Sequence, residues 1–367
     1  MVTHGVAVNV AESVVLPGLI SGTTIVCAGV CSGTLAANKM ALLEPGTFKD
    51  VVGDESQMGK AYRAVFNQSR AQFVAINVSN DVAGGQKGIE LMADVEEELS
   101  TETLSVRPDL LVPLRRREAA VATDLSDMAD ELLAYGVSEV TYGTAAEAVA
   151  WNTASGGKRI IAVVPTVNTL GMTGVSGAAF LAGAIARNDV LRGRYASPSN
   201  ILVPGVTYPA GTPALGQPYQ STSANSAKLD AANVHSFIRR DGFTYTWGGT
   251  TKYDPATDAR RFIGVGRQFD EIIQRFVRLA LDFQGRGVAS QVLTRFLNGG
   301  NNILSTMQSA GAILNGQVRA LPGDNSLTDL KNGKVTINLE YTPVYPIRLL
   351  SYNVSLSDTG LLEVIGG

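Results

Sequence analysis

The chain has 367 residues, which is enough for two or more domains with hydrophobic cores of their own. Its 30 basic and 33 acidic residues give a formal net charge of -3, and this balance argues against a nucleic-acid-binding or membrane-surface protein. With 45% hydrophobic and only 17% charged residues, the composition favours a chain that buries extra surface against copies of itself.

The N-terminal region is apolar but does not resemble a membrane span. The run over residues 14–31 is broken by Pro17, Gly18 and several hydroxyl residues, and no basic segment precedes it. Cys27 and Cys31 are too far apart to form a disulfide within an extended strand, so we interpret them as small buried side chains. We expect a soluble protein made in the cytoplasm, without membrane insertion.

Two strands are predicted near the start of the chain. Residues 5–10 alternate as a half-buried strand does, and residues 23–30 form a more buried one. Pro17 and Gly18 lie between them as a hinge. The first strand can pair inside its own sheet or reach the sheet edge of another molecule.

Helices and strands alternate through the middle of the chain. We predict helices over residues 56–68, 88–99, 118–135 and 145–151, and strands over residues 71–78, 108–113, 139–142 and 159–164. Such alternation is typical of a mainly parallel sheet covered by helices.

The last third is more helical. We predict helices over residues 266–283, 288–297 and 302–313, then strands over residues 334–341 and 349–355. The first of these helices is amphipathic, with Ile272 and Phe276 on one face and Arg275 and Arg278 on the opposite face.

No catalytic, cofactor or metal site emerges from the sequence. His4 and His235 are the only histidines and fit no metal-ligand spacing. Glycine-rich stretches at residues 156–158 and 171–177 lack the context of a phosphate-binding loop or dinucleotide fold. Asp189 and Asp241 stay open as an acid–base pair, with structural salt bridges as the alternative.

Four stretches together form a recognisable pattern. They are residues 4–6 (HGV) with the strand at 23–26, residues 184–200 (AIARND…LRG…ASPSN), residues 229–250 (L…NV…IRRDGF…WGGT) and residues 335–346 (VTINLEYTPVYP). In this order they resemble the tail sheath proteins of contractile phage tails and of the related R-type bacteriocins. One departure is Gly248-Gly249, where many members of that family have WGNR or WGAR.

The resemblance implies a multi-domain fold: an outer α/β domain and a mixed α/β C-terminal sheath domain, with arms at both chain ends that donate strands to neighbouring subunits. It divides the chain into an N-terminal arm (1–18), an outer domain (19–235), an inner domain facing the tube (236–348) and a C-terminal arm (349–367). The apolar strand residues expected to exchange between subunits are Val6, Val8, Val10, Leu350, Tyr352 and Val354. As tube contacts we predict Arg275, Arg278 and Arg295, although an ordinary solvated helix face accounts for them equally well.

The implied function is structural: helical polymerisation around a tail tube, and contraction that drives the tube through a host envelope. Expected partners are further copies of the chain, the tail tube protein, and the baseplate and tail terminator proteins, with no cofactor and no nucleic-acid contact. The expected location is a virion tail assembled in the bacterial cytoplasm. Alternatives are the sheath of a bacteriocin or of a cell-borne injection system, another self-assembling virion protein, or an α/β enzyme with an unusual site.

Overall fold

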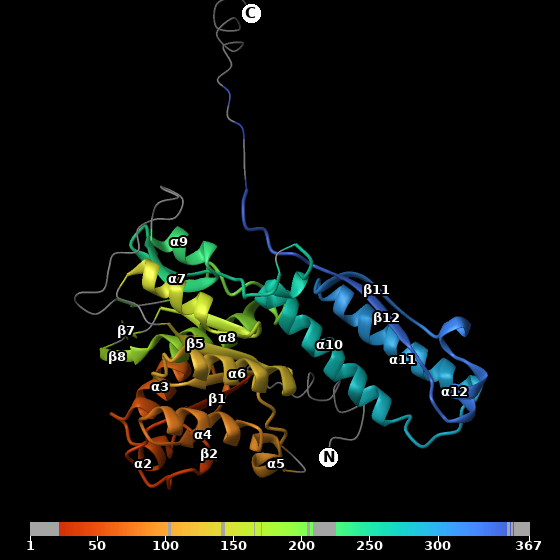
Figure 1. Ribbon diagram of the computed structural model, residues 1–367, viewed down its shortest axis with the longest axis horizontal. Coiled ribbons are helices and arrows are strands. Elements are labelled where there is room, and N and C mark those ends of the chain that lie inside the picture. Colours follow the sequence, from red (N-terminus) through yellow and green to blue (C-terminus); the bar gives the residue numbers. More distant parts are fainter. Residues whose placement is uncertain are drawn as a thin grey trace, which may run out of the picture.

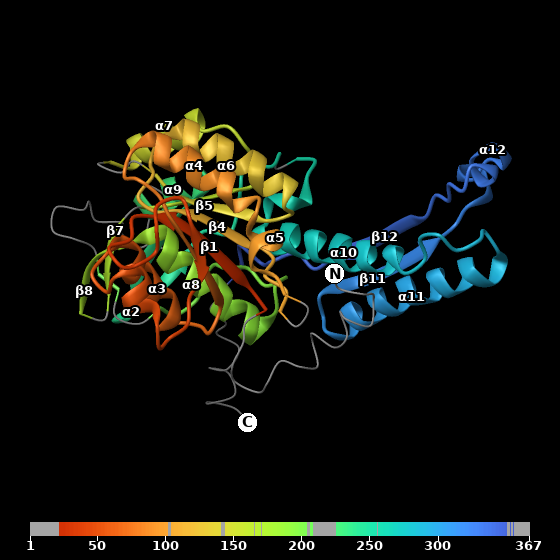
Figure 2. The ribbon, with the colours of Figure 1, turned by 90° about the horizontal axis from the view of Figure 1, so that it is seen from below.

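The computed structural model describes residues 22–101, 104–140, 144–164, 166–169, 171–203, 206–207, 225–254, 256–350, 353 and 355. These residues form an α/β body and an elongated C-terminal unit that extends from it (Figures 1 and 2). We call residues 22–247 the body and residues 263–343 the C-terminal unit. The predicted strand at residues 5–10 lies outside the described residues.

The body is built on an eight-stranded sheet with the order β10-β9-β6-β5-β4-β1-β3-β2. All neighbours from β3 to β9 are parallel, and the edge strands β2 and β10 are antiparallel. The strands are β1 (Thr24–Gly29), β2 (Met40–Leu42), β3 (Gln72–Asn77), β4 (Leu110–Pro113), β5 (Tyr135–Glu139), β6 (Ile160–Val163), β9 (Val234–Arg240) and β10 (Phe243–Trp247).

Helices cover both faces of this sheet, as Figure 2 shows. One face carries α3 (Gln57–Phe66) and α8 (Gly177–Arg192), and the other carries α4 (Val82–Met92), α6 (Ala119–Glu131) and α7 (Ala145–Ala154). The smaller elements of the body are α2 (Phe48–Val52), α5 (Val95–Leu99), α9 (Asn225–Ala231) and the hairpin of β7 (Thr166–Thr169) with β8 (Met172–Ser176). The predicted mainly parallel, helix-covered sheet is confirmed.

The C-terminal unit has a separate, smaller core. Its elements are α10 (Ile263–Leu281), α11 (Ser290–Ser309), β11 (Ile313–Arg319), η2 (Pro322–Asp324), α12 (Leu327–Lys331) and β12 (Asn338–Pro343), and the short helix η1 (Ala259–Arg261) precedes it. Strands β11 and β12 form a two-stranded antiparallel sheet. Ile272 of α10 and Leu304 of α11 pack with Ile313 and Val318 of β11 in the core between helices and sheet.

Two helix predictions miss a boundary. The structure ends α6 at Glu131 and places Tyr135 in β5, so the helix end predicted at residue 135 is wrong. The strand predicted at residues 139–142 begins four residues earlier, at Tyr135, and residues 141 and 142 lie outside the described residues. Burial explains the shift, because Tyr135 is 1% exposed in the centre of the sheet. The helix predicted over residues 88–99 is divided into α4 and α5.

The two helices predicted over residues 288–297 and 302–313 are one continuous helix, α11. The pair Gly299-Gly300 lies between the two predicted helices, and glycine costs a helix interior about 1 kcal/mol relative to alanine. In the structure a Cβ atom at Gly300 would meet the Phe276 ring at 2.8 Å and Val318 at 3.0 Å. Tertiary packing therefore selects glycine here for close approach and overrides its helix propensity.

His235 in β9 offers a test of this packing by pH. It is 1% exposed, and burial lowers the pKa of its imidazole to about 4. Because this lies below the unfolded value of about 6.5, the neutral ring stabilises the fold above pH 6.5 and that stability is lost as pH falls toward 4. Between pH 7 and 4.5 the native chain should lose about 2 kcal/mol more unfolding free energy than His235→Leu. Urea titrations at several pH values measure this, and parallel pH profiles for the two proteins would contradict it.

Candidate functional site

The C-terminal unit is joined to the body by buried ion pairs along α10. Arg267 of α10 makes a bidentate pair with Asp189 of α8, with both nitrogen–oxygen distances 2.6 Å and both side chains about 95% buried (5% and 4% exposed). Asp270, one turn later, pairs with Arg159 at the start of β6 at 2.6 and 3.0 Å. Two-point guanidinium–carboxylate pairs fix orientation as well as distance.

Further contacts surround these pairs. The Thr23 hydroxyl donates to Asp189 at 2.6 Å, and Arg159 also reaches Asp130 of α6 at 2.6 Å. Arg194 pairs with Asp109 at 2.7 and 3.2 Å beside them. A charge left buried without its partner is costly, so this network favours one arrangement of the two parts.

A close backbone approach accompanies the charges. A Cβ atom at Gly266 would lie 1.8 Å from the Tyr135 hydroxyl, and one at Gly264 would lie 2.2 Å from the Tyr195 carbonyl oxygen. The first turns of α10 therefore need glycine to reach the body. The Tyr195 hydroxyl then donates to the Ala310 carbonyl oxygen at 2.8 Å and ties the body to the end of α11.

One of the four stretches that form the recognisable pattern, residues 184–200, lies at this junction. Asp189 belongs to AIARND, and the Asn188 amide donates to the carbonyl oxygens of Ala196 and Ser197 in the following ASPSN stretch. Arg240 donates to Asn200 at 3.1 Å and connects the IRRDGF stretch to ASPSN. Of the two interpretations of Asp189, an acid–base pair or a structural salt bridge, the structure shows the salt bridge.

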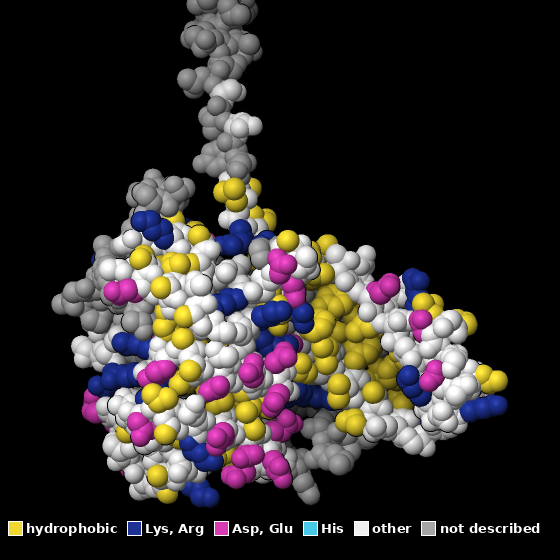
Figure 3. Space-filling model, in the orientation of Figure 1, with side chains coloured by type: hydrophobic (Ala, Val, Ile, Leu, Met, Phe, Trp, Pro, Cys, Tyr) yellow, Lys and Arg dark blue, Asp and Glu magenta, His cyan; other side chains and the backbone are white. Residues whose placement is uncertain are grey.

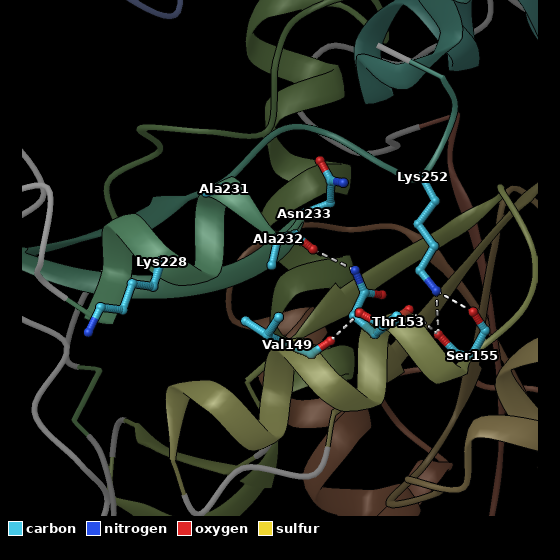
Figure 4. Close-up of a pocket in the computed structure, with 9 residues that line it drawn as sticks. Val149, Thr153, Ser155, Lys228, Ala231, Ala232, Asn233 and Lys252 are labelled. Atoms are coloured by element: carbon cyan, nitrogen blue, oxygen red, sulfur yellow. Dashed lines mark hydrogen bonds between the residues drawn. The ribbon is translucent and has the colours of Figure 1, made fainter.

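The open pockets do not assemble a reactive pair. Figure 4 shows a hollow of about 650 Å³ between the end of α7 and α9, where Lys252 points across to Ser155. The Lys252 amine donates to the Ser155 carbonyl oxygen and lies 2.8 Å from its Oγ, and burial lowers the pKa of this amine to about 8. Since Ser155 is the C-cap of α7 and 2% exposed, the lysine is placed as a cation at a helix C-terminus.

Other chemistry is also limited in the described part of the chain. Those residues bring together no cluster of three or more potential metal ligands. Their helices include none of the length and apolar character needed to span a membrane. His235 is packed beneath Gly248 in the β9–β10 region and His4 lies outside the described residues.

The predicted assembly residues are only partly placed. Val6, Val8, Val10, Tyr352 and Val354 lie outside the described residues, and Leu350 is 76% exposed in an irregular segment. Among the predicted tube contacts, the Arg275 side chain is 12% exposed and pairs with Glu271 at 2.6 Å, Arg278 is half-buried and Arg295 is exposed.

The junction arginines Arg159 and Arg267 were not singled out from the sequence. Arg159 stands directly before a buried apolar strand, where a lone charge requires a partner.

Comparison with known proteins agrees with the arrangement. No family model matches the chain. A protein assigned as a prophage major tail sheath protein in Pseudomonas aeruginosa (strain UCBPP-PA14) is 27% identical over 337 residues, covering 85% of this chain and 84% of that protein. The tail sheath protein of Escherichia phage P2 is 25% identical over 349 residues, covering 91% and 83%.

A solved structure has the same fold along nearly the whole chain. The helical sheath of the anti-feeding prophage in its contracted state aligns with a TM-score of 0.71 and 16% identity, covering 92% of this chain and 94% of that one. Along most of its length the chain is therefore similar to contractile tail sheath proteins. It also has the fold of a solved contractile sheath.

The junction predicts a large penalty for breaking one buried pair. Asp189→Asn leaves the Arg267 guanidinium buried without its carboxylate, so unfolding free energy should fall by about 3–5 kcal/mol. Lys87→Met, which removes the exposed pair of Lys87 with Glu90, should cost less than about 1 kcal/mol. Denaturant unfolding measures both, and the paired apolar variant Asp189→Leu with Arg267→Met should recover most of the loss. An Asp189→Asn chain as stable as the Lys87→Met control would contradict this account.

Proposed function

We propose that this chain is a non-catalytic sheath subunit that polymerises helically around a tail tube and contracts to drive the tube through a host envelope. The observation that carries the proposal is the open sheet of the C-terminal unit. Within the described residues neither β11 nor β12 pairs with a third strand. On the outer edge of β11 the Asn301 side chain already bonds the N–H and C=O of Val318, so the edge of β12 is the more open of the two. Such edges accept a strand from another molecule.

The same chain supplies a segment suited to such pairing. After β12 the backbone continues through Ile347, Leu349 and Leu350, which are 84%, 82% and 76% exposed. Arg348, between them, pairs with Asp230 of α9 and holds the start of this segment on the body. We propose that residues 349–367 and 1–18 are arms that add strands to neighbouring subunits, with Val6, Val8, Val10, Leu350, Tyr352 and Val354 as their apolar residues.

The proposed division between domains follows the sheet and the cores. The sequence suggested a boundary at residue 235, but β9 (Val234–Arg240) crosses it, and β10 belongs to the same sheet. We therefore propose an outer domain that continues to about residue 247, and an inner, tube-facing domain that begins near α10.

Contraction is proposed to move whole subunits. The buried pairs Arg267–Asp189 and Arg159–Asp270 oppose rotation of the C-terminal unit against the body, because rotation would separate buried charges. Strand-exchanged arms would then act as the flexible links, and head-to-tail contacts would propagate as an open helix. The extended sheath would be a kinetically trapped state that releases free energy when it contracts.

Partners and location follow from this proposal. Beyond its own copies, the subunit would contact the tube protein, the baseplate and a tail terminator, in a tail particle assembled in the bacterial cytoplasm. Sheath relatives occur in a prophage and in phage P2, and a contracted sheath of the same fold belongs to the anti-feeding prophage. A bacteriocin or injection-system sheath would use the same surfaces.

Deleting residues 1–15 tests the arms. The shortened chain should stay folded, because the two described cores begin after this segment, but it should form no sheath. Negative-stain electron microscopy over a concentration series, with the intact chain prepared in parallel, shows the difference. Striated tubes from both proteins at the same concentration would overturn the arm proposal, whereas tubes from neither would count against the sheath function itself.

Arg295 tests the tube contact. Of the three predicted arginines Arg295 is the exposed one, whereas Arg275 forms an ion pair with Glu271. Since an exposed ion pair contributes about 0–1 kcal/mol, Arg295→Glu should weaken co-sedimentation with purified tubes by no more than about tenfold per subunit, and more at low salt. Lys39→Glu, an exposed charge reversal in the body, is the control. Equal tube binding by both variants at low salt would remove Arg295 from the contact.

A further inference from the structure

The body places a basic cavity at the carboxyl ends of its parallel strands. The chain passes from β1 to β3 on one side and then crosses to β4 on the other, so the order of strands reverses between β1 and β4. In open α/β sheets the crevice at this reversal is where partners are bound. A cavity of about 450 Å³ opens at this edge, lined by Gln57, Asn80, Arg115, Arg116, Arg117 and Thr166.

Three consecutive arginines give the cavity its charge, and none of its six lining residues is acidic. Arg116 is 7% exposed and donates from Nη2 to the Ser79 carbonyl oxygen at 2.8 Å. Arg115 donates from Nη2 to the Gly174 carbonyl oxygen at 2.7 Å. Backbone carbonyls orient these two guanidinium groups, and the Asp81 carboxylate lies close enough to interact with the charge of Arg116.

Arg117 differs from the other two. Its Nε donates to Glu139 at 3.1 Å, and the Glu139 side chain is 0% exposed, so this charge is balanced within the body. The exposed positive charge at the mouth is therefore that of Arg115, whose guanidinium is already fixed in position, with Arg116 buried beside it. Oriented guanidinium groups of this kind recognise carboxylates.

The opposite end of the body carries the complementary charge. Helix α4 leads from the carboxyl edge of the sheet back to its amino edge, and α5 follows there (Figure 1). Glu96, Glu97 and Glu98 of α5 are all exposed, and acidic side chains gather at this end in Figure 3. The arginine cavity and the acidic helix cannot meet within one molecule, because they lie at opposite edges of one rigid sheet.

We propose that the arginine cavity of one copy receives the acidic α5 of a second copy. The contact joins two different surfaces of the same chain, so it repeats head to tail and suits a helical lattice. It rests on the proposed sheath function and adds to it a lateral contact between α/β bodies, separate from the strand-exchanging arms. Charge contacts of this kind set register and speed of association more than total affinity.

Charge reversal in the full-length chain tests the contact. Arg115→Glu should raise the concentration needed for half-maximal polymerisation, measured by sedimentation, by tenfold or more. Glu97→Arg with Glu98→Arg should do the same, and all three changes in one chain should recover at least half of the effect on a logarithmic scale. Lys39→Glu, an exposed reversal outside both surfaces, should leave the concentration within twofold of the intact chain. Arg115→Glu chains that polymerise like this control would overturn the proposal.

Cross-linking separates this contact from the sheath function as a whole. A chain with Arg115→Cys mixed with one carrying Glu97→Cys should give disulfide-linked dimers under mild oxidation, and a mixture of Lys39→Cys with Glu97→Cys should not. Dimers at the control level would overturn the contact even where tubes form. Absence of tubes from the intact chain would instead count against the sheath function. Binding of inorganic phosphate lost in Arg115→Glu, with polymerisation unchanged, would reassign the cavity to a small anion and also overturn the proposal.

Discussion

The shape of this subunit depends on two bidentate ion pairs buried between α10 and the body. Arg267 with Asp189 and Arg159 with Asp270 add to the apolar contacts of the junction, where Ile263 packs in the core of the body and Tyr195 packs against the core of the C-terminal unit. An apolar interface can slide at little cost, whereas a buried charge that leaves its partner loses several kcal/mol at once. The pairs therefore fix one arrangement of α10 against the body more than they add to the free energy of unfolding. A fixed arrangement matters for a subunit whose position is repeated along a lattice.

Glycine in α10 allows a close approach to the body that a side chain would prevent. The Tyr135 hydroxyl occupies the space of a Cβ atom at Gly266, so α10 approaches the sheet more closely than any other residue there would allow. Tyr135 is itself buried in the centre of the sheet, and burial raises the pKa of its hydroxyl well above the usual value. Core, close approach and ion pairs thus specify the same docking position for the helix.

Much of the body could be predicted from the sequence, because its signals are local. Alternation of apolar strands with amphipathic helices gave the class of fold and most elements. The errors occurred where contacts between residues far apart in the sequence determine the local structure. Burial places Tyr135 in β5, and Gly300 stays helical because Phe276 and Val318 leave no room for a side chain. The junction could not be derived in this way, since Arg159 and Asp270 are 111 residues apart and nothing in the sequence pairs them. One motif stretch, residues 184–200, carried part of the resemblance to tail sheath proteins before its place at the junction was visible.

Contacts within the subunit and contacts between subunits differ in how they use charge. The junction pairs are buried and bidentate, so separating either one would leave charges buried without a partner. Arg115 at the mouth of the cavity and the glutamates of α5 are exposed to solvent, where water screens each pair and dissociation is easy. A lattice that assembles, stays extended and then rearranges needs both kinds of ion pair. Strong pairs suit the parts of a subunit that do not move, and numerous weak pairs suit the contacts that neighbouring subunits exchange. Strand-exchanging arms would carry continuity through that change, because main-chain pairing persists while weak side-chain contacts are exchanged.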